Sequence, residues 1–354
     1  MGKLSDTWIA AGKKGAAWLV AHQGPKGNYI GREAPDARGL YPDVDDLAAY
    51  YKSVYPLRIA GESAAAARML QHILDRFGQP NGDLVNSPTQ RTTGSYTPNF
   101  CQLYPNMWIV RGANALRWYD AQEKLISFIF QNRDPQSGGF YATVEPKTKV
   151  IDANATGVGV MVSIHAGRYA AAQQTCDLLL RMLDEQPDPQ RLYFRYIPGE
   201  GFETDYEGKD EKYRWNCYID STKEKQAYWP WGMPMINLAN MWALTGERKY
   251  LDGAVRIFDF LDHKCHADAF HHVTAGKCGW GAAILYRLTG DRRYRDRAVS
   301  QMEFLLSVQH ADGYFMGLGV KDESEMHPRY LYDYTGEWTT WLIDTAIEFA
   351  AKGE

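Results

Sequence analysis

Apolar side chains recur at intervals of three and four residues along most of this chain, which is the spacing of one face of an α-helix. Two segments, 245–261 and 289–306, both open with T-G-[ED]-R-[KR]-Y and continue as amphipathic helices. Residues 60–74, 117–130 and 165–183 follow the same pattern more weakly. We therefore predict a repeated unit whose first part is an amphipathic helix.

Each amphipathic helix is expected to end in a tight turn, and a second, more apolar helix follows the turn. The turns combine Gly with Asn or Asp in several cases, and they are residues 23–29, 79–84, 136–141 and 309–315. Apolar residues spread around a helix are typical of a helix that is buried on most sides. These second helices are expected near residues 43–60, 104–117, 152–166, 228–245, 275–289 and 333–350.

The pattern amounts to six helix pairs, and 354 residues give about 59 residues to each pair, enough for two helices and two loops. We predict an all-α protein, a closed (α/α)6 toroid with an inner and an outer ring of helices. An open α-solenoid built from the same pairs is the alternative. The long aromatic loops before the second helices favour closure. Because no Pro/Ser-rich linker or block of charge divides the chain, we expect one domain over residues 1–354.

The composition is that of a globular protein, with 45% hydrophobic and 23% charged residues, and it excludes disorder and collagen-like repeats. The apolar runs fall well short of a membrane-spanning helix, so no transmembrane segment is expected. The first residues lack the apolar core of a secretory signal, which leads us to expect a cytoplasmic protein. A net charge of −4 argues against nucleic acid as a partner and leaves a small-molecule substrate.

Motifs for cofactors and metals are missing. The sequence has no G-x-G-x-x-G after a strand, no P-loop and no H-E-x-x-H, so we expect no cofactor. The five cysteines are widely spaced without a C-x-x-C pair and are expected to be reduced thiols. The segment that holds His263, Cys265, His266, His271 and His272 fits no standard zinc spacing, and we predict no metal there.

In a closed toroid, the amino-terminal ends of the inner helices meet at one mouth, where their free N–H groups favour negative charge. Polar groups that converge in an apolar cavity are the default expectation for a binding site. High aromatic content, 13% of residues, suits the walls of such a cavity. The candidate substrate-binding residues at this mouth are Tyr41, Tyr104, Asn106, Asp152, Trp231, Lys277, Tyr334 and Glu337.

The sharpest motif is P-D-V-D-D, residues 42–46, at the start of an expected inner helix. Carboxylates this close repel one another, so we expect a proton to be held by at least one of Asp43, Asp45 and Asp46. A protonated carboxylic acid in an aromatic pocket is a general acid for an alkene, an epoxide or a glycosidic oxygen. The alternative is that these residues only cap the helix, since Asp is a favoured residue at that position.

The same motif resembles the D-x-D-D acid motif of squalene–hopene cyclases and other class II terpene cyclases, and the Q-x-x-D-G-Y-F turn (309–315) resembles their Q-W repeats. The resemblance extends to the terpenoid cyclase and protein prenyltransferase toroid superfamily. It implies that Asp45 is the proton donor, flanked by Asp43 and Asp46. The chain has Leu47-Ala48 where those enzymes continue with Thr-Ala, and it has the length of one barrel rather than two. The patterns at 104–108 and 276–291 also resemble uncharacterised single-toroid proteins.

Other candidates at the mouth are a base and further acids. His272 is a candidate catalytic base near pH 7, and Lys277 is a candidate anion-binding or low-pKa amine. Asp152, Asp333 and Glu337 are further acids, and two acids across a cavity could perform glycosidic chemistry, although capping is the favoured interpretation of Asp152. Trp231 either stacks on a ligand or belongs to the core.

These observations support three hypotheses. The first is a cofactor-independent cyclase or isomerase that protonates an apolar, terpenoid-like molecule through Asp45. The second is a carbohydrate-active toroid, namely a glycoside hydrolase, a lyase or a sugar epimerase, because fold alone does not decide function. The third is a non-catalytic helical-repeat binding protein. A dry aromatic cavity favours the first, a polar cleft with Trp side chains the second, and an open concave face the third.

Overall fold

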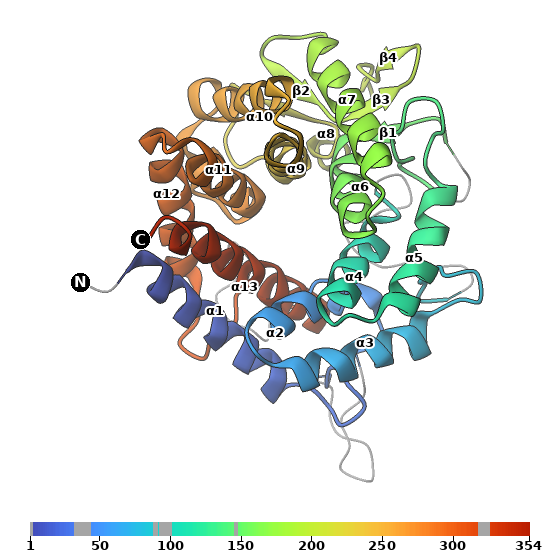
Figure 1. The fold of residues 1–354 in the computed structure, drawn as a ribbon, viewed down its shortest axis with the longest axis vertical. Coiled ribbons are helices and arrows are strands. Elements are labelled where there is room, and N and C mark those ends of the chain that lie inside the picture. Colours follow the sequence, from blue (N-terminus) through green and yellow to red (C-terminus); the bar gives the residue numbers. More distant parts are fainter. Residues whose placement is uncertain (1–2, 32–43, 88–90, 92–100, 145–147, 318–325) are drawn as a thin grey trace.

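The computed structural model describes residues 3–31, 44–87, 91, 101–144, 148–317 and 326–354. Within these ranges, two concentric rings of helices surround a common axis (Figure 1). The outer ring consists of α1 (Leu4–Ala21), α3 (Ser63–Phe77), α5 (Tyr119–Gln131), α7 (Tyr169–Asp184), α10 (Arg248–Asp259) and α12 (Arg292–Val308). The inner ring consists of α2 (Val54–Ile59), α4 (Tyr104–Ala115), α6 (Ala153–His165), α9 (Trp229–Thr245), α11 (Gly276–Thr289) and α13 (Pro328–Ala350).

The inner ring is closed. Each inner helix packs against the next in chain order, and the last, α13, packs against the first, α2. The first outer helix, α1, also packs along α13, so the two ends of the chain meet (Figure 1). The predicted all-α (α/α)6 toroid is confirmed, and the open solenoid is excluded by this closure.

The inner helices are buried on nearly all sides, as their apolar circumference predicted. Ten of the twelve residues of α4 and eleven of the thirteen of α6 are buried. Close approach of these helices needs small residues where they cross. At Gly157 of α6, a Cβ atom would lie 2.6 Å from Pro234 of α9, so only glycine fits at this crossing.

The predicted turns repeat the same geometry after several outer helices. Gly27, Gly82 and Gly313 all have positive φ, and a short antiparallel bridge closes each turn. A Cβ atom at any of the three would lie within 2.1–2.4 Å of a backbone oxygen, that of Arg68, Lys124 or Lys14 respectively. Each turn therefore rests on the next outer helix around the ring, and glycine is required both by φ and by space.

The first inner element differs from the helix expected over residues 43–60. Residue 43 lies outside the described residues, and the rest of the segment divides into a 3₁₀ turn, η1 (Leu47–Ala49), and the short helix α2. Pro56 lies inside α2 near its start, where a missing N–H costs least. The irregular residues 50–53 between η1 and α2 bring Lys52 into the interior, where it is 5% exposed.

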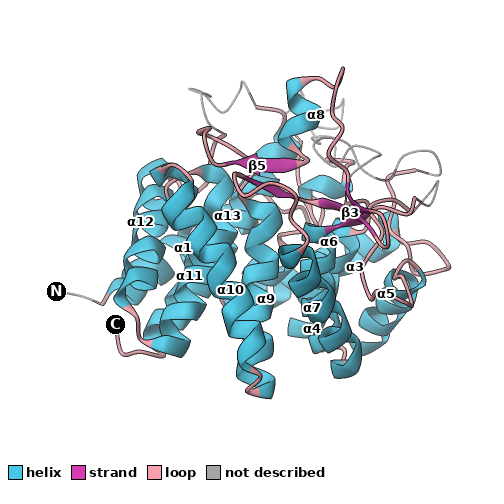
Figure 2. Ribbon diagram, turned by 90° about the horizontal axis from the view of Figure 1, so that it is seen from above, coloured by secondary structure: helices cyan, strands magenta, loops and turns pink. Residues whose placement is uncertain are grey.

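Short strands that the helical pattern did not predict lie between α7 and α9, and one more lies just before α6. Strands β1 (Ile151–Asp152), β3 (Arg195–Ile197) and β4 (Gly201–Phe202) form one antiparallel sheet, in which Ile151 pairs with Tyr196 and Tyr196 with Phe202. Strands β2 (Arg191–Tyr193) and β5 (Tyr218–Asp220) form another. The short helix α8 (Glu211–Trp215) precedes β5. These strands and α8 gather at one end of the barrel (Figure 2).

A single contiguous cluster of buried apolar side chains runs through both rings, and a smaller cluster of Tyr193, Tyr206 and Cys217 lies under the strands. Three short 3₁₀ and π segments, η2 (Phe260–Lys264), η3 (Ala267–Phe270) and η4 (Val273–Ala275), connect α10 to α11. None of the described helices is long and apolar enough to cross a membrane.

Candidate active site

A cavity of about 300 Å³ is lined in part by Phe194 and Trp215, which belong to the region of short strands. Residues at or just before the amino-terminal ends of five inner helices line it, together with Lys52 ahead of α2. This is the mouth at which the topology predicted that the inner helices converge. The lining residues include Lys52, Cys101, Asp152, Asn154, Phe194, Trp215, Trp229, Thr274, Lys277, Tyr330, Asp333, Tyr334, Glu337 and Trp338.

One face of α13 supplies the largest part of the wall. Tyr330, Asp333, Tyr334, Glu337 and Trp338 all line the cavity, and their spacing of three and four residues places them along one side of the helix. The rings of Tyr334 and Trp338 stack with centroids 5.2 Å apart and an interplanar angle of 2°. The helix thus presents two acids within an aromatic surface.

Two buried lysines, one from the irregular residues before α2 and one from α11, meet these acids. Lys277, the second residue of α11, donates a hydrogen bond from Nζ to Glu337 Oε1 at 2.6 Å. Lys52 donates to Glu337 Oε2, and its Nζ also lies 3.1 Å from Asp333 Oδ1. The side chains of Lys52, Lys277, Asp333 and Glu337 are 4%, 3%, 8% and 14% exposed. We call these four residues the charged cluster; with both lysines and both acids ionised, its charges cancel.

Burial and mutual charge shift the pKa values of this cluster in different directions. Burial raises the pKa of Asp333 to about 6, because the attraction of Lys52 offsets only part of the desolvation and Glu337 adds repulsion. Burial also opposes ionisation of Glu337, but Lys277 and Lys52 outweigh it and lower the pKa of Glu337. The pKa of Lys277 is lowered by burial, since Glu337 compensates only in part and Lys52 repels it. Asp333 is therefore the acid of the pair that exchanges protons near neutral pH.

Cys101, Asp152 and Asn154 form a second polar wall, contributed by the segment before α4 and by the start of α6. Asp152 is the amino-terminal cap of α6, and its Oδ1 accepts the N–H of Ala155 at 3.0 Å and the thiol of Cys101 at 2.7 Å. Burial raises the pKa of Asp152, and the hydrogen bond from Cys101 reduces that shift without reversing it. The predicted capping role of Asp152 is confirmed, and the same side chain also lines the cavity.

Aromatic side chains complete the cavity. Trp229 at the start of α9 packs edge-on against Trp215 at the end of α8, with ring centroids 4.8 Å apart. Phe194, between β2 and β3, also lines the cavity. The site therefore combines aromatic walls with a few buried polar groups, the composition of a small-molecule binding site.

The P-D-V-D-D motif does not contribute to this cavity. The carboxylate of Asp45 is 59% exposed and pairs with Arg76 of α3 at 2.5 Å, so the expected orientation of Asp45 into an aromatic cavity is wrong. Asp46 is buried, but it caps η1 through the N–H of Ala48 and binds Arg329 at 3.2 Å. Asp43 and Tyr41 lie outside the described residues. The capping interpretation of the motif therefore holds for Asp46.

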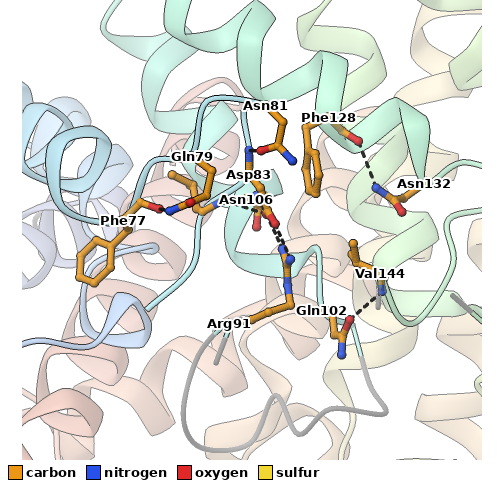
Figure 3. Close-up of polar contacts among 11 residues, drawn as sticks. Phe77, Gln79, Asn81, Asp83, Arg91, Gln102, Asn106, Phe128, Asn132 and Val144 are labelled. Atoms are coloured by element: carbon orange, nitrogen blue, oxygen red, sulfur yellow. Dashed lines mark hydrogen bonds and ion pairs between the residues drawn. The ribbon is translucent and has the colours of Figure 1, made fainter. Parts of the chain in front are cut away.

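Three of the predicted substrate-binding residues, Tyr104, Asn106 and Trp231, do not line the cavity and contact other parts of the protein. Asn106 donates to Asp83 Oδ1 at 3.1 Å, and both carboxylate oxygens of Asp83 hold Arg91 (Figure 3). The indole N–H of Trp231 donates to the carbonyl of Tyr193 at 3.0 Å, and Trp231 is fully buried. The ring of Tyr104 lies beneath the charged cluster, 5.6 Å from Lys277 Nζ, without lining the cavity. Position at a helix start placed these residues near the mouth, but their side chains point elsewhere.

The histidine segment separates into individual contacts. His272 caps η4, and its Nδ1 lies 2.8 Å from the hydroxyl group of Thr274. Thr274 is among the residues that line the cavity, and His272 is not. Burial lowers the pKa of His272. His263 lies 3.4 Å from Asp262, His266 3.4 Å from Glu224, and His271 contacts Ser300. In the part of the chain that the structure describes, no group of three or more potential metal ligands gathers.

The cavity also contains residues that the sequence did not single out. Lys52 is the most important, because it links both acids of the cluster. The sequence predicted a continuous helix through residue 52. Lys52 therefore had no special position in that prediction and was not singled out. The only local signal is its place six residues after the last Asp of the motif, between the aromatic residues Tyr50–Tyr51 and Tyr55.

Comparisons with known proteins identify the fold. No protein-family model matches the chain, and a comparison with curated proteins finds no relative. Among solved structures, a D-mannose isomerase aligns over 96% of this chain and 97% of its own with a TM-score of 0.68 and 13% identity. A family 76 glycoside hydrolase (mannosidase) from Bacteroides thetaiotaomicron aligns over 95% and 98%, with a TM-score of 0.62 and 12% identity.

A type II terpene cyclase from Scytonema also aligns, over 98% of this chain and 99% of its own, with a TM-score of 0.56 and 11% identity. The expected terpenoid cyclase relationship is thus one of several, and each of these neighbours is an enzyme with a toroid fold. These structural alignments, at identities of 11–13%, show that the chain shares the toroid fold of these proteins.

Proposed function

We propose that this protein is an acid–base enzyme that acts on a small carbohydrate, and that its reaction is isomerisation or epimerisation next to a carbonyl group. The observation that carries the proposal is the buried charged cluster in the wall of the aromatic cavity. The shared fold with a D-mannose isomerase makes D-mannose the first substrate to test.

The charged cluster suits proton transfer at a carbon next to a carbonyl. Such a reaction needs one base to remove the proton and one positive group to stabilise the negative charge on the oxygen. Asp333, with its pKa raised to about 6, is ionised at pH 7 and still basic enough to accept a proton. Lys277 supplies the positive charge, and Glu337 holds its ammonium group in place at 2.6 Å.

The same cluster opposes the terpenoid hypothesis. Cyclisation of a terpenoid passes through carbocations, which aromatic rings and carboxylates stabilise and ammonium groups repel. Two buried ammonium groups lie in the cavity wall, and Asp45, the expected proton donor, is exposed to solvent. Polar recognition of hydroxyl groups is the chemistry that this lining favours.

Glycoside hydrolysis requires two carboxyl groups on opposite sides of the scissile bond. Asp333 and Glu337 are four residues apart on one helix and share Lys52, so they act from the same side. Asp333 and Glu337 on their own therefore do not make the facing pair of carboxyl groups that hydrolysis requires.

The test is a nuclear magnetic resonance assay of the purified protein with D-mannose, D-glucose, D-fructose and a mannose oligosaccharide. The proposal predicts interconversion of free sugars, lost by at least about 100-fold in Asp333→Asn. Asp291→Asn is the matched control, because Asp291 is an exposed helix cap on α12 away from the cavity. Release of free mannose from the oligosaccharide would favour hydrolysis, and no turnover of any sugar would contradict the proposal.

A further inference from the structure

The wall formed by Cys101, Asp152 and Asn154 has no part in the proton transfer assigned to the charged cluster, yet it is built from buried polar groups. Asp152 is 3% exposed and Asn154 is 2% exposed, and both line the cavity. Among the described residues, the side-chain oxygen of Asn154 has no hydrogen-bond partner, although it is fully buried. A buried acceptor without a donor costs free energy, so a ligand hydroxyl group is its natural partner.

The position of this wall in the ring is opposite the charged cluster. The inner helices follow one another as α2, α4, α6, α9, α11 and α13, so α6 is the third and α13 the sixth (Figure 1). In a ring of six, the third and sixth members face each other. Asp152, the cap of α6, and Asp333, in the second turn of α13, belong to these two facing helices and line the same cavity.

Local contacts hold the Asp152 carboxyl group in a defined orientation. The hydrogen bonds from Ala155 N–H and from the Cys101 thiol both fall on Oδ1. Cys101 has a positive φ of 37°, a conformation that is costly for a residue other than glycine. The next residue, Gln102, fixes this segment by accepting the N–H of Val144 at 2.6 Å (Figure 3). With Oδ1 engaged, Oδ2 is the oxygen placed to exchange a proton with a ligand.

Sugar isomerisation requires a step that Asp333, the base of the charged cluster, does not provide. A hexose exists in solution almost entirely as a ring, and it has no carbonyl group until the ring opens. Ring opening needs a proton donor at the ring oxygen, and a base that is ionised at neutral pH cannot be that donor. The donor must therefore be an acid of the cavity other than Asp333, and the carboxyl group of Asp152 is one such acid.

Resting on the proposed function, we propose that Asp152 opens the sugar ring, with Asn154 as the acceptor for a sugar hydroxyl group and Cys101 as a positioning residue. The Oδ2–H of Asp152 gives its proton to the ring oxygen, and the bond between that oxygen and the anomeric carbon breaks. The electron pair of the anomeric O–H bond forms the carbonyl group, and the released proton returns through water to the Asp152 carboxylate. The step needs no other reactant.

Burial raises the pKa of the Asp152 carboxyl group above its ordinary value, and the hydrogen bond from Cys101 and the charge of Arg195 reduce that rise. Asp152 and Asp333 then have separate tasks, one as an acid on α6 and the other as a base on α13.

The experiment follows two reactions of the same sugar. Freshly dissolved α-D-mannose is mixed with the protein at low temperature, and the approach to the mixture of anomers and the formation of ketose are recorded separately by nuclear magnetic resonance. We expect Asp152→Asn to slow both reactions by about 100-fold or more. Asp333→Asn is expected to lose ketose formation and to keep the catalysed interconversion of anomers. Asn retains the helix cap at position 152, and Asp291→Asn controls for the same change at a remote cap.

The outcomes separate the two proposals. If Asp152→Asn opens the ring as fast as the unaltered protein while Asp333→Asn loses ketose formation, the role of Asp152 is refuted and the proposed function stands. If the protein catalyses neither reaction, both are refuted. Two further variants probe the supporting residues: Cys101→Ala is expected to shift the pH dependence of ring opening, which Cys101→Ser should restore. Asn154→Leu is expected to weaken binding of D-mannitol, an open-chain polyol, by tenfold or more, and unchanged affinity would remove Asn154 from the proposal.

Discussion

Removal of the negative charge at Glu337 is the perturbation whose consequence the structure defines most fully. In Glu337→Gln, the ammonium groups of Lys52 and Lys277 lose a shared partner in a site where each lysine side chain is less than 5% exposed. Each pair of opposite charges about 4 Å apart is worth about 4 kcal/mol at an effective dielectric constant of 20. Desolvation offsets much of this attraction, and breaking a buried pair by removing one partner costs about 3–5 kcal/mol. We expect a loss of this size in the free energy of unfolding.

The assay is urea unfolding at neutral pH, with Asp45→Asn as the matched comparison. Asp45 and Arg76 form an ion pair of similar distance, but their side chains are 59% and 40% exposed, so its loss should cost less than about 1 kcal/mol. The double variant Glu337→Gln/Lys277→Met removes both members of one pair, and we expect it to recover part of the lost stability. A loss in Glu337→Gln no larger than that in Asp45→Asn would refute the reasoning that the cluster is buried and mutually dependent.

Other predictions follow from the same contacts. Because the pKa of Glu337 is lowered in the folded protein, its contribution to stability is complete above about pH 4.5 and disappears as pH falls further, a dependence that Glu337→Gln should lack in acid unfolding experiments. Because the pKa of Asp333 is raised to about 6, kcat/KM for the sugar should rise through about pH 6 as this base loses its proton, and Lys277, with a lowered pKa, should set the alkaline limb; a profile that is flat between pH 5 and 7 would contradict the role of Asp333. Asp45→Asn should leave kcat and KM unchanged in steady-state kinetics, and a large loss of activity would return the P-D-V-D-D motif to the site. Gly82→Ala should lower stability by at least about 1 kcal/mol in urea unfolding, because φ is +91° and the added Cβ would lie 2.3 Å from a backbone oxygen of α5.

The fold could be predicted from the sequence because its signal is repeated. A helix that is apolar on one side and a helix that is apolar all round alternate along the chain, and the turns that join them need glycine for a shared geometric reason. The segment between Glu185 and Tyr228 has no such periodicity, so its short strands and α8 were not expected. They matter for the site, since Phe194 and Trp215 form part of the wall.

The candidate site could be predicted only in part. Asp152, Lys277, Tyr334 and Glu337 were expected at the mouth, and the structure brings them to one cavity. Asn106 and Trp231 were expected there for the same reason and point away, because successive side chains on a helix are rotated by about 100° and only some of each first turn face the axis.

The motif P-D-V-D-D shows a different limit. Its spacing is compatible with a proton donor and with a helix start, and the sequence cannot choose between them. The choice depends on Arg76 and Arg329, which are distant in sequence and meet Asp45 and Asp46 only in the folded protein. Lys52 was missed for a different reason. The chain breaks between η1 and α2, and helix propensity did not reveal this break, which brings Lys52 to both acids.

The central claim is that the charged cluster moves a proton at the carbon next to a sugar carbonyl. It is tested most directly with D-mannose carrying deuterium at carbon 2, with the conversion rate and the fate of the label measured by nuclear magnetic resonance. The account predicts that the deuterated sugar reacts more slowly than the ordinary sugar and that label is released into water. Asp333→Asn should neither convert the sugar nor release label above background, whereas Asp291→Asn should behave as the unaltered protein. Conversion that retains all of the label, or that proceeds normally in Asp333→Asn, would contradict it.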